Sequence, residues 1–110
     1  MARMLILIIV VGLLTTTSTT FAASEDMITT SKSCYAASIQ LAETSGAASE
    51  HALLRNHLME NALPKLGIME TTARIDGDNA LSQAALMKGV TKDKMALDLF
   101  NQVCKPIFFR

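Results

Sequence analysis

The chain contains only two cysteines, Cys34 and Cys104, and they lie near opposite ends of the sequence that follows an apolar leader. In an oxidising compartment, an even pair of cysteines is typical of a disulfide. We therefore predict a Cys34–Cys104 bridge, which would stabilise the fold by about 4 kcal/mol because it closes a long loop in the unfolded chain. The alternative is a pair of free buried thiols. A C-x-x-C redox or metal motif is absent.

The chain begins with the three parts of a secretory signal, which we place at residues 1–22. Arg3 supplies a positive charge, Met4–Leu14 is apolar, and the remainder is small and polar. As a helix, the apolar run is too short to span a hydrocarbon core of about 30 Å. We expect cleavage after Ala22, which leaves residues 23–110 as one domain in the periplasm or outside the cell. The alternative is an uncleaved membrane anchor.

The stretch from Thr91 to Phe109 has the clearest helical pattern. Thr91 is expected to cap a helix there, and Pro106 to stop it near Lys105, because proline lacks a backbone donor. Apolar residues recur at three- and four-residue spacing, as in a helix that buries one face: Met95, Ala96, Leu99, Phe100, Val103 and Cys104.

Three further helices are predicted upstream. The first begins near Ser24 and ends at Gly46, which can adopt a left-handed cap; the alternative is a helix that continues into the next one. The second covers about Ala47–Leu63, with an inner face that includes Leu54, Leu58 and Leu53, and ends or kinks at the following proline. The third covers about Met69–Lys88, with an expected interruption at Asp76–Asn79.

No stretch of the sequence shows the alternation of a strand, and no internal repeat is present. The sequence therefore predicts an all-α fold: a small four-helix bundle, or a three-helix bundle if the first two helices are continuous. The predicted disulfide joins the first and last helices. Tyr35, Phe100 and Phe108 are then expected to form an aromatic corner beside the bridge.

The sequence lacks a catalytic or cofactor signature, so we expect no enzyme, no cofactor and no metal site. His51 and His57 are the only histidines, and on a helix they point about 120° apart, so they cannot chelate one ion. Asp76–Asn79 resembles the start of a calcium loop, but the twelfth position is Met87 instead of glutamate. Ten basic residues balance ten acidic ones, which provides no basic stripe for nucleic acid.

Two features are candidates for partner binding. The apolar C-terminal end, with Phe108 and Phe109, can dock on a partner where it is exposed. The alternative is that this end folds back over the disulfide, in which case Phe109 is the side chain expected to stay outside. Asp76 and Asp78 are the second feature, since their carboxylates can meet a basic partner.

The resulting hypothesis is a small exported helical protein that binds another envelope or periplasmic protein, as an adaptor, inhibitor or immunity-type protein. One alternative is a carrier of a small ligand or metal, which needs an internal cavity lined by Met and Leu near His57. Another is a stress chaperone of the periplasm. No nucleic-acid partner and no stable membrane insertion after signal cleavage are expected.

Overall fold

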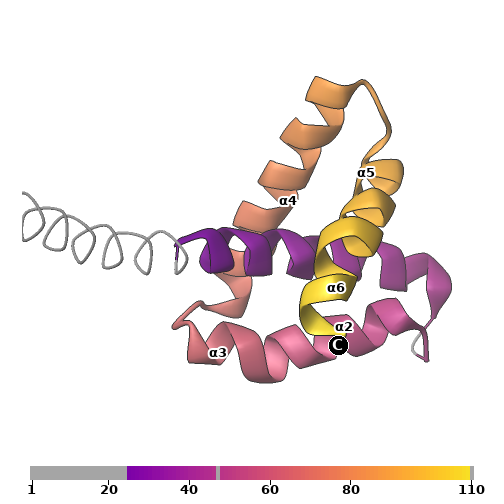
Figure 1. The fold of residues 1–110 in the computed structure, drawn as a ribbon. Helices are drawn as coiled ribbons and strands as arrows, with labels where there is room; N and C mark the ends of the chain where they lie inside the picture. Colours follow the sequence, from indigo (N-terminus) through magenta and orange to yellow (C-terminus); the bar gives the residue numbers. More distant parts are fainter. Residues whose placement is uncertain (1–24, 47, 110) are drawn as a thin grey trace, which may run out of the picture.

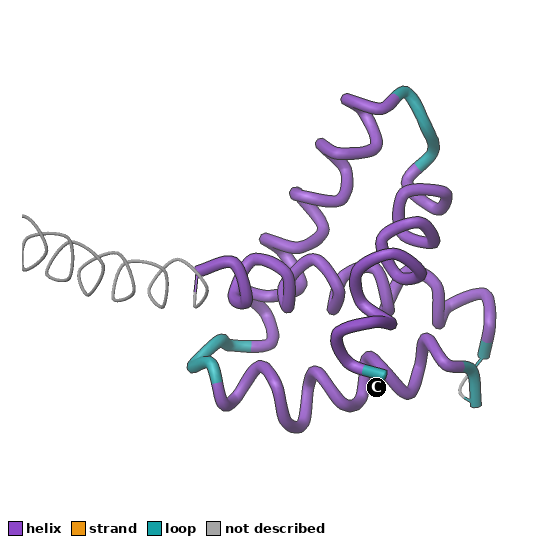
Figure 2. Tube along the Cα trace, viewed as in Figure 1, coloured by secondary structure: helices purple, strands orange, loops and turns teal. Residues whose placement is uncertain are grey.

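The computed structural model of the protein describes residues 25–46 and 48–109 (Figure 1). Figure 2 shows that these residues form helices joined by short turns, with no strand in the part of the chain described. The predicted leader and the expected cap Ser24 lie outside the described residues. The all-α fold predicted from the sequence is confirmed.

The described chain forms four helical units. The first, which we call the N-terminal helix, covers residues 25–45. In Figure 1 it crosses the middle of the molecule, with α2 and α3 below it and a hairpin of α4 and α5 above it. The other three units are α2 (Glu50–His57) with the π-helix η1 (Leu58–Ala62) and α3 (Leu63–Lys65), then α4 (Glu70–Lys88), then α5 (Lys92–Leu99) with the π-helix η2 (Phe100–Cys104) and α6 (Lys105–Phe108).

The ends of these units follow local capping chemistry. Gly46 and Gly89 have positive φ angles of 92° and 68°, which favour glycine, and end the N-terminal helix and α4. The Ser49 and Thr91 hydroxyls accept backbone hydrogen bonds at the starts of α2 and α5. The first two helices are therefore separate, and the prediction for Thr91 is confirmed.

Neither proline ends its helix, so the predicted stop at Pro106 is wrong. A π-helix precedes each proline: the Leu63 N–H donates to the Leu58 carbonyl, and the Lys105 N–H donates to the Phe100 carbonyl. These i→i−5 bonds widen the turn just before the ring, where an ordinary helix would clash with it. The chain then continues as a helix through Pro64 and Pro106.

The interruption expected at Asp76–Asn79 is also wrong, because α4 is continuous through it. Gly77 lies buried in the middle of α4, where that helix meets the N-terminal helix. A Cβ atom added at Gly77 would lie 2.0 Å from the Lys32 carbonyl oxygen and 2.9 Å from the Ala36 Cβ. The glycine is therefore required by the close approach of two helices, and not by a turn.

The disulfide joins Cys34 of the N-terminal helix to Cys104 at the end of η2, with 5.7 Å between their Cα atoms. Both cysteines are fully buried, and they belong to one core with apolar side chains from every helical unit. The predicted link between the first and last helices is confirmed. The largest buried side chains of this core are Tyr35, Phe100, Leu54, Leu58, Leu63 and Leu81.

Leu53 is exposed to solvent, although the sequence predicted it to be in the core. Leu53 was expected on the inner face of its helix, but it is 56% exposed, whereas Leu54 and Leu58 are buried. Within the described residues, no helix is both long and apolar enough to cross a membrane.

Candidate functional site

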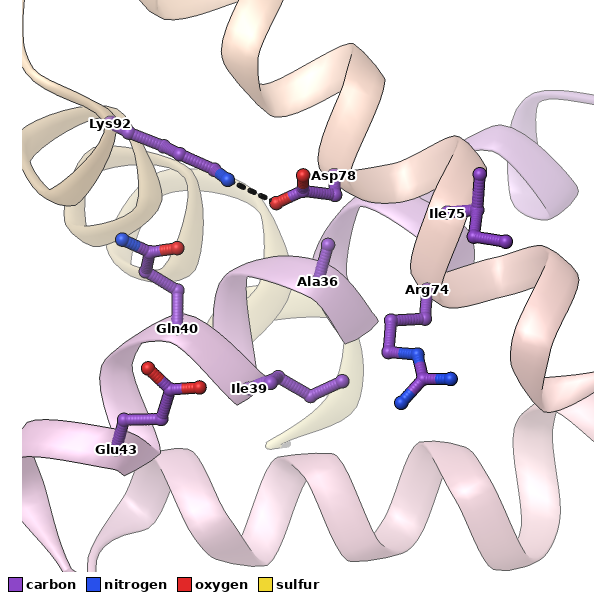
Figure 3. Close-up of a pocket in the computed structure, with 8 residues that line it drawn as sticks. All are labelled: Ala36, Ile39, Gln40, Glu43, Arg74, Ile75, Asp78 and Lys92. Carbon is purple, nitrogen blue, oxygen red and sulfur yellow. Dashed lines mark ion pairs between the residues drawn. The ribbon is translucent and has the colours of Figure 1, made fainter.

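A cleft of about 350 Å³ lies between the N-terminal helix, α4 and the start of α5 (Figure 3). Its lining combines three apolar side chains, Ala36, Ile39 and Ile75, with five polar or charged ones. The size is at the lower end of the range typical of small-molecule pockets, and the cleft is open to solvent.

The N-terminal helix contributes one of its faces to the cleft. Ala36, Ile39, Gln40 and Glu43 are three, one and three residues apart, so a helix of 3.6 residues per turn places them on the same side. Ala36 is buried against α4, Ile39 is half-buried, and Glu43 is exposed. This face is therefore apolar where it meets α4 and acidic toward solvent.

The α4 side of the cleft is formed by Arg74, Ile75 and Asp78. Ile75 is 59% exposed. Ile75 is not part of the buried face of α4. The residues of that face recur every four positions: Ala73, Gly77, Leu81 and Ala85. A large aliphatic side chain is thus held at the surface on the α4 side of the cleft, and the half-buried Ile39 lines the cleft from the N-terminal helix.

The charged groups around this apolar surface are partly neutralised. Asp78 forms an ion pair with Lys92 (Figure 3). The Gln40 side chain donates to the Asp93 carboxylate, and this hydrogen bond joins the N-terminal helix to α5. Within the described chain, Glu43 forms no ion pair. Figure 3 shows Ile39 between the side chains of Glu43 and Arg74, so the apolar surface has an acidic group on one side and a basic group on the other.

Arg74 is positioned by a buried tyrosine. The Tyr35 hydroxyl donates to Glu70 Oε1 over 3.0 Å, and the Arg74 Nε lies 3.9 Å from the same oxygen. Burial raises the pKa of Tyr35 to about 12, and the hydrogen bond and the negative charge of Glu70 act in the same direction. Tyr35 therefore remains a neutral donor at ordinary pH and holds Glu70 beside Arg74.

The cleft offers apolar, charged and hydrogen-bonding side chains for contact with a bound molecule. Apolar side chains flanked by opposite charges suit a partner segment that presents an apolar side chain between a basic and an acidic residue.

The predicted C-terminal site residues lie on the core. Phe108 and Phe109 are both half-buried and pack against the core. The prediction that Phe109 stays outside is wrong: its ring centroid lies 6.2 Å from that of Phe100. The reason is that the helix continues through Pro106, so the chain does not turn away from the core. A role of these residues in partner binding stays a prediction.

The expected aromatic corner is composed differently. Phe100 and Phe108 pack edge-on against His51 and His57 of α2, with ring centroids 4.5 and 6.1 Å apart. Tyr35 belongs to the same core as Phe100, but its hydroxyl is directed to Glu70 of α4. The corner beside the disulfide therefore pairs phenylalanine with histidine.

The two aspartates predicted to meet a basic partner are already paired within the protein. Asp76 lies 3.0 Å from the Lys32 ammonium, and Asp78 pairs with Lys92. Only Asp78 lines the cleft. The structure thus separates the two: Asp76 joins the N-terminal helix to α4, and Asp78 borders the candidate site.

No group of three His, Cys, Asp or Glu side chains able to hold a metal ion occurs among the residues that the structure describes. The cleft is lined by no Met, Leu or His, so it differs from the cavity near His57 that a ligand carrier was expected to have. His57 is exposed and contacts Phe108.

The sequence analysis missed the two isoleucines that line the cleft, Ile39 and Ile75, and the charged residues Glu43 and Arg74. One signal was present. In the segment that forms α4, Ile75 stands out of phase with the small and apolar residues at 73, 77, 81 and 85. A large apolar residue off the buried stripe of a helix is a candidate for an exposed contact.

The fold and the cleft together define an all-α protein with a disulfide between its first and last helices and a small cleft with a mixed apolar and charged lining. Comparison with models of protein families, with curated proteins and with solved structures finds no match to this chain.

Proposed function

We propose that this protein acts outside the cytoplasm by binding another protein, and that the cleft between the N-terminal helix and α4 is the contact surface. The observation that carries the proposal is Ile75, an aliphatic side chain 59% exposed on the α4 side of the cleft, together with Ile39, which lies between Glu43 and Arg74. An apolar centre with a charged border is the usual anatomy of a protein interface.

The buried disulfide supports a location in an oxidising compartment, the periplasm or the exterior of the cell. The partner is then another envelope, periplasmic or extracellular protein, and the role is that of an adaptor, an inhibitor or an immunity-type protein. The open shape of the cleft favours a protein segment over an enclosed small ligand, because ligand pockets bury most of the ligand surface.

The proposal is tested by affinity capture from the cell envelope after brief crosslinking, with the protein tagged so that the cleft stays free. The variant Ile75→Glu replaces the exposed aliphatic side chain on the α4 side of the cleft with a charge. The matched control is Leu53→Glu, since Leu53 is an aliphatic residue of similar exposure on α2, outside the cleft. We expect one partner at near-equal stoichiometry with the parent and with Leu53→Glu, and its loss with Ile75→Glu.

Two results would contradict the proposal. Retention of the partner by Ile75→Glu would mean that the contact surface lies elsewhere. Capture of many proteins in small amounts, increasing at low pH, would instead indicate the chaperone alternative. Circular dichroism of each variant checks that the helical fold is intact, so that a lost partner reports on the surface and not on unfolding.

A further inference from the structure

The turn between α4 and α5 exposes the most accessible large apolar side chains of the described chain. Leu86 is 82% exposed and Met87 88%, and Val90 follows them at 36%. We call these three residues the apolar tip. In Figure 1 the turn lies at the end of the α4–α5 hairpin that points away from α2 and α3.

The backbone holds this tip in place. Gly89 adopts the left-handed cap at the end of α4, and the Val90 N–H donates to the Ala85 carbonyl over 3.0 Å. The Thr91 hydroxyl then caps α5 by accepting from the Lys94 N–H over 3.1 Å. The apolar side chains are therefore presented to solvent by an ordered turn.

The turn also contains and adjoins lysine residues. Lys88, Lys92 and Lys94 lie within or next to the turn, against one acid, Asp93. Lys92 and Lys94 pair with Asp78 and Asp98, respectively. Lys88 is exposed and takes part in no ion pair within the described chain. The tip thus combines three apolar side chains with one lysine, Lys88, whose charge no acid of the described chain neutralises.

We propose that the apolar tip attaches the protein reversibly to a membrane surface that contains anionic phospholipids. Leu86, Met87 and Val90 enter the boundary between headgroups and acyl chains, and Lys88 stays at the level of the phosphates. Exposed apolar groups bordered by lysine have both components of interfacial binding, apolar burial and attraction to anionic lipids.

The shape and size of the tip favour a membrane over a protein partner. A standard protein interface covers roughly 800 Å² on each side, with a concave or flat centre. Three aliphatic side chains on a turn provide much less surface, and that surface is convex. A lipid interface accepts a convex tip because lipids rearrange around it.

The absence of tryptophan from the chain permits a local test in the full protein. In Met87→Trp the single indole reports on the tip alone. Its emission should shift to the blue with vesicles of phosphatidylcholine and phosphatidylglycerol, and much less with phosphatidylcholine alone. The matched control is Met69→Trp, since Met69 is also strongly exposed but lies before α4, away from the tip.

Two further variants separate the components of binding. Leu86→Ser should weaken vesicle binding about tenfold, which corresponds to the loss of one exposed aliphatic side chain from the apolar phase. Lys88→Glu should abolish the preference for anionic vesicles. Neither change touches the cleft, so capture of a protein partner through Ile75 should persist in both variants.

The proposal is overturned if the Met87→Trp emission does not change with either vesicle, or if Met69→Trp shifts equally. An equal shift with both vesicle types would remove the anionic lipid from the proposal. Loss of a captured protein partner in Leu86→Ser, without any effect of vesicles, would assign the tip to a protein contact and would also overturn it.

Discussion

Gly77 has the strictest steric requirement of any residue discussed above. A glycine inside an exposed helix normally costs stability, and replacing it with alanine gains about 1 kcal/mol. At Gly77 the added methyl group would overlap the Lys32 carbonyl oxygen, which is backbone and cannot rotate away. We therefore predict that Gly77→Ala lowers the free energy of unfolding by about 2–3 kcal/mol, measured by urea denaturation.

The control for this substitution is Asn79→Ala, an exposed position two residues further along the same helix. Alanine there should leave the stability unchanged or raise it slightly, because only helix propensity changes. A Gly77→Ala protein that is as stable as the parent would mean that the two helices are not in close contact at this point.

Tyr35 gives the stability of the protein a distinct dependence on alkaline pH. Its folded-state pKa of about 12 lies above the ordinary value of 10.0 for a tyrosine, so the folded protein holds the phenol proton more tightly than the unfolded chain does. The stabilisation is complete below about pH 10 and is lost as the pH rises to about 12, an effect of at most about 3 kcal/mol. Tyr35→Phe should remove the part of the stability loss at alkaline pH that comes from ionisation of this phenol.

Because Tyr35 is the only tyrosine, its ionisation can be followed directly by ultraviolet absorbance. The midpoint should lie near pH 12 in the native protein, and in denaturant it should return to the value of a free phenol, about 10. A native midpoint near 10 would mean that the hydroxyl is open to solvent and not bonded to Glu70.

At the scale of the elements, the last unit differs most from its sequence-based prediction. The heptad-like pattern after Thr91 identified the helix and its buried face, since Met95, Ala96, Phe100 and Cys104 are all buried. The end was missed because proline was treated as a stop. A π-helix lets the chain pass Pro106, as another does at Pro64, and the three- and four-residue spacing of an ordinary helix does not record this change of turn.

The consequence of that longer helix is a structural role for Phe109. Since its ring packs against Phe100, we predict that Phe109→Ser lowers the free energy of unfolding by about 1–2 kcal/mol, less than for a fully buried phenylalanine. Thermal denaturation followed by circular dichroism measures the change. Leu53→Ser, at a position 56% exposed on α2, is the control and should have little effect. An unchanged melting temperature for Phe109→Ser would place this ring in solvent.

In α4, local sequence preferences predicted an interruption that the structure does not have. Asp76, Gly77, Asp78 and Asn79 are each typical of turns, and together they favoured an interruption. Tertiary contacts override that local preference, because Gly77 packs under Lys32 while Asp76 and Asp78 pair with lysines of two neighbouring helices. The helix and its end at Gly89 were predictable, but its continuity through this segment was not.

At the scale of the whole molecule, the disulfide joins residues 70 positions apart and fixes the first helix against the last. We predict that the double variant Cys34→Ser/Cys104→Ser is less stable by about 4 kcal/mol, because the unfolded chain regains the entropy of the open loop. For a domain with roughly 5–15 kcal/mol of stability, this is a large fraction. Urea denaturation measures it, and equal midpoints for the variant and the parent would show that the bridge has no stabilising effect.

The candidate site could be predicted only in part. The bridge and the all-α fold follow from local patterns of the sequence, whereas export and partner binding stay predictions. The cleft arises where Ile39 and Glu43 of one helix meet Arg74 and Ile75 of another, and this meeting depends on the crossing at Gly77. The angle and position of a helix crossing come from packing, so spacing within each helix could not reveal them.

The central claim is that the surface around Ile75 contacts a protein partner in the cell. The most direct measurement is site-specific photo-crosslinking, with a photoreactive amino acid in place of Ile75 and, as the control, in place of Leu53. The account predicts one crosslinked product of defined mass from position 75 and none from position 53. Crosslinking from position 53 alone, or the same products from both positions, would contradict it.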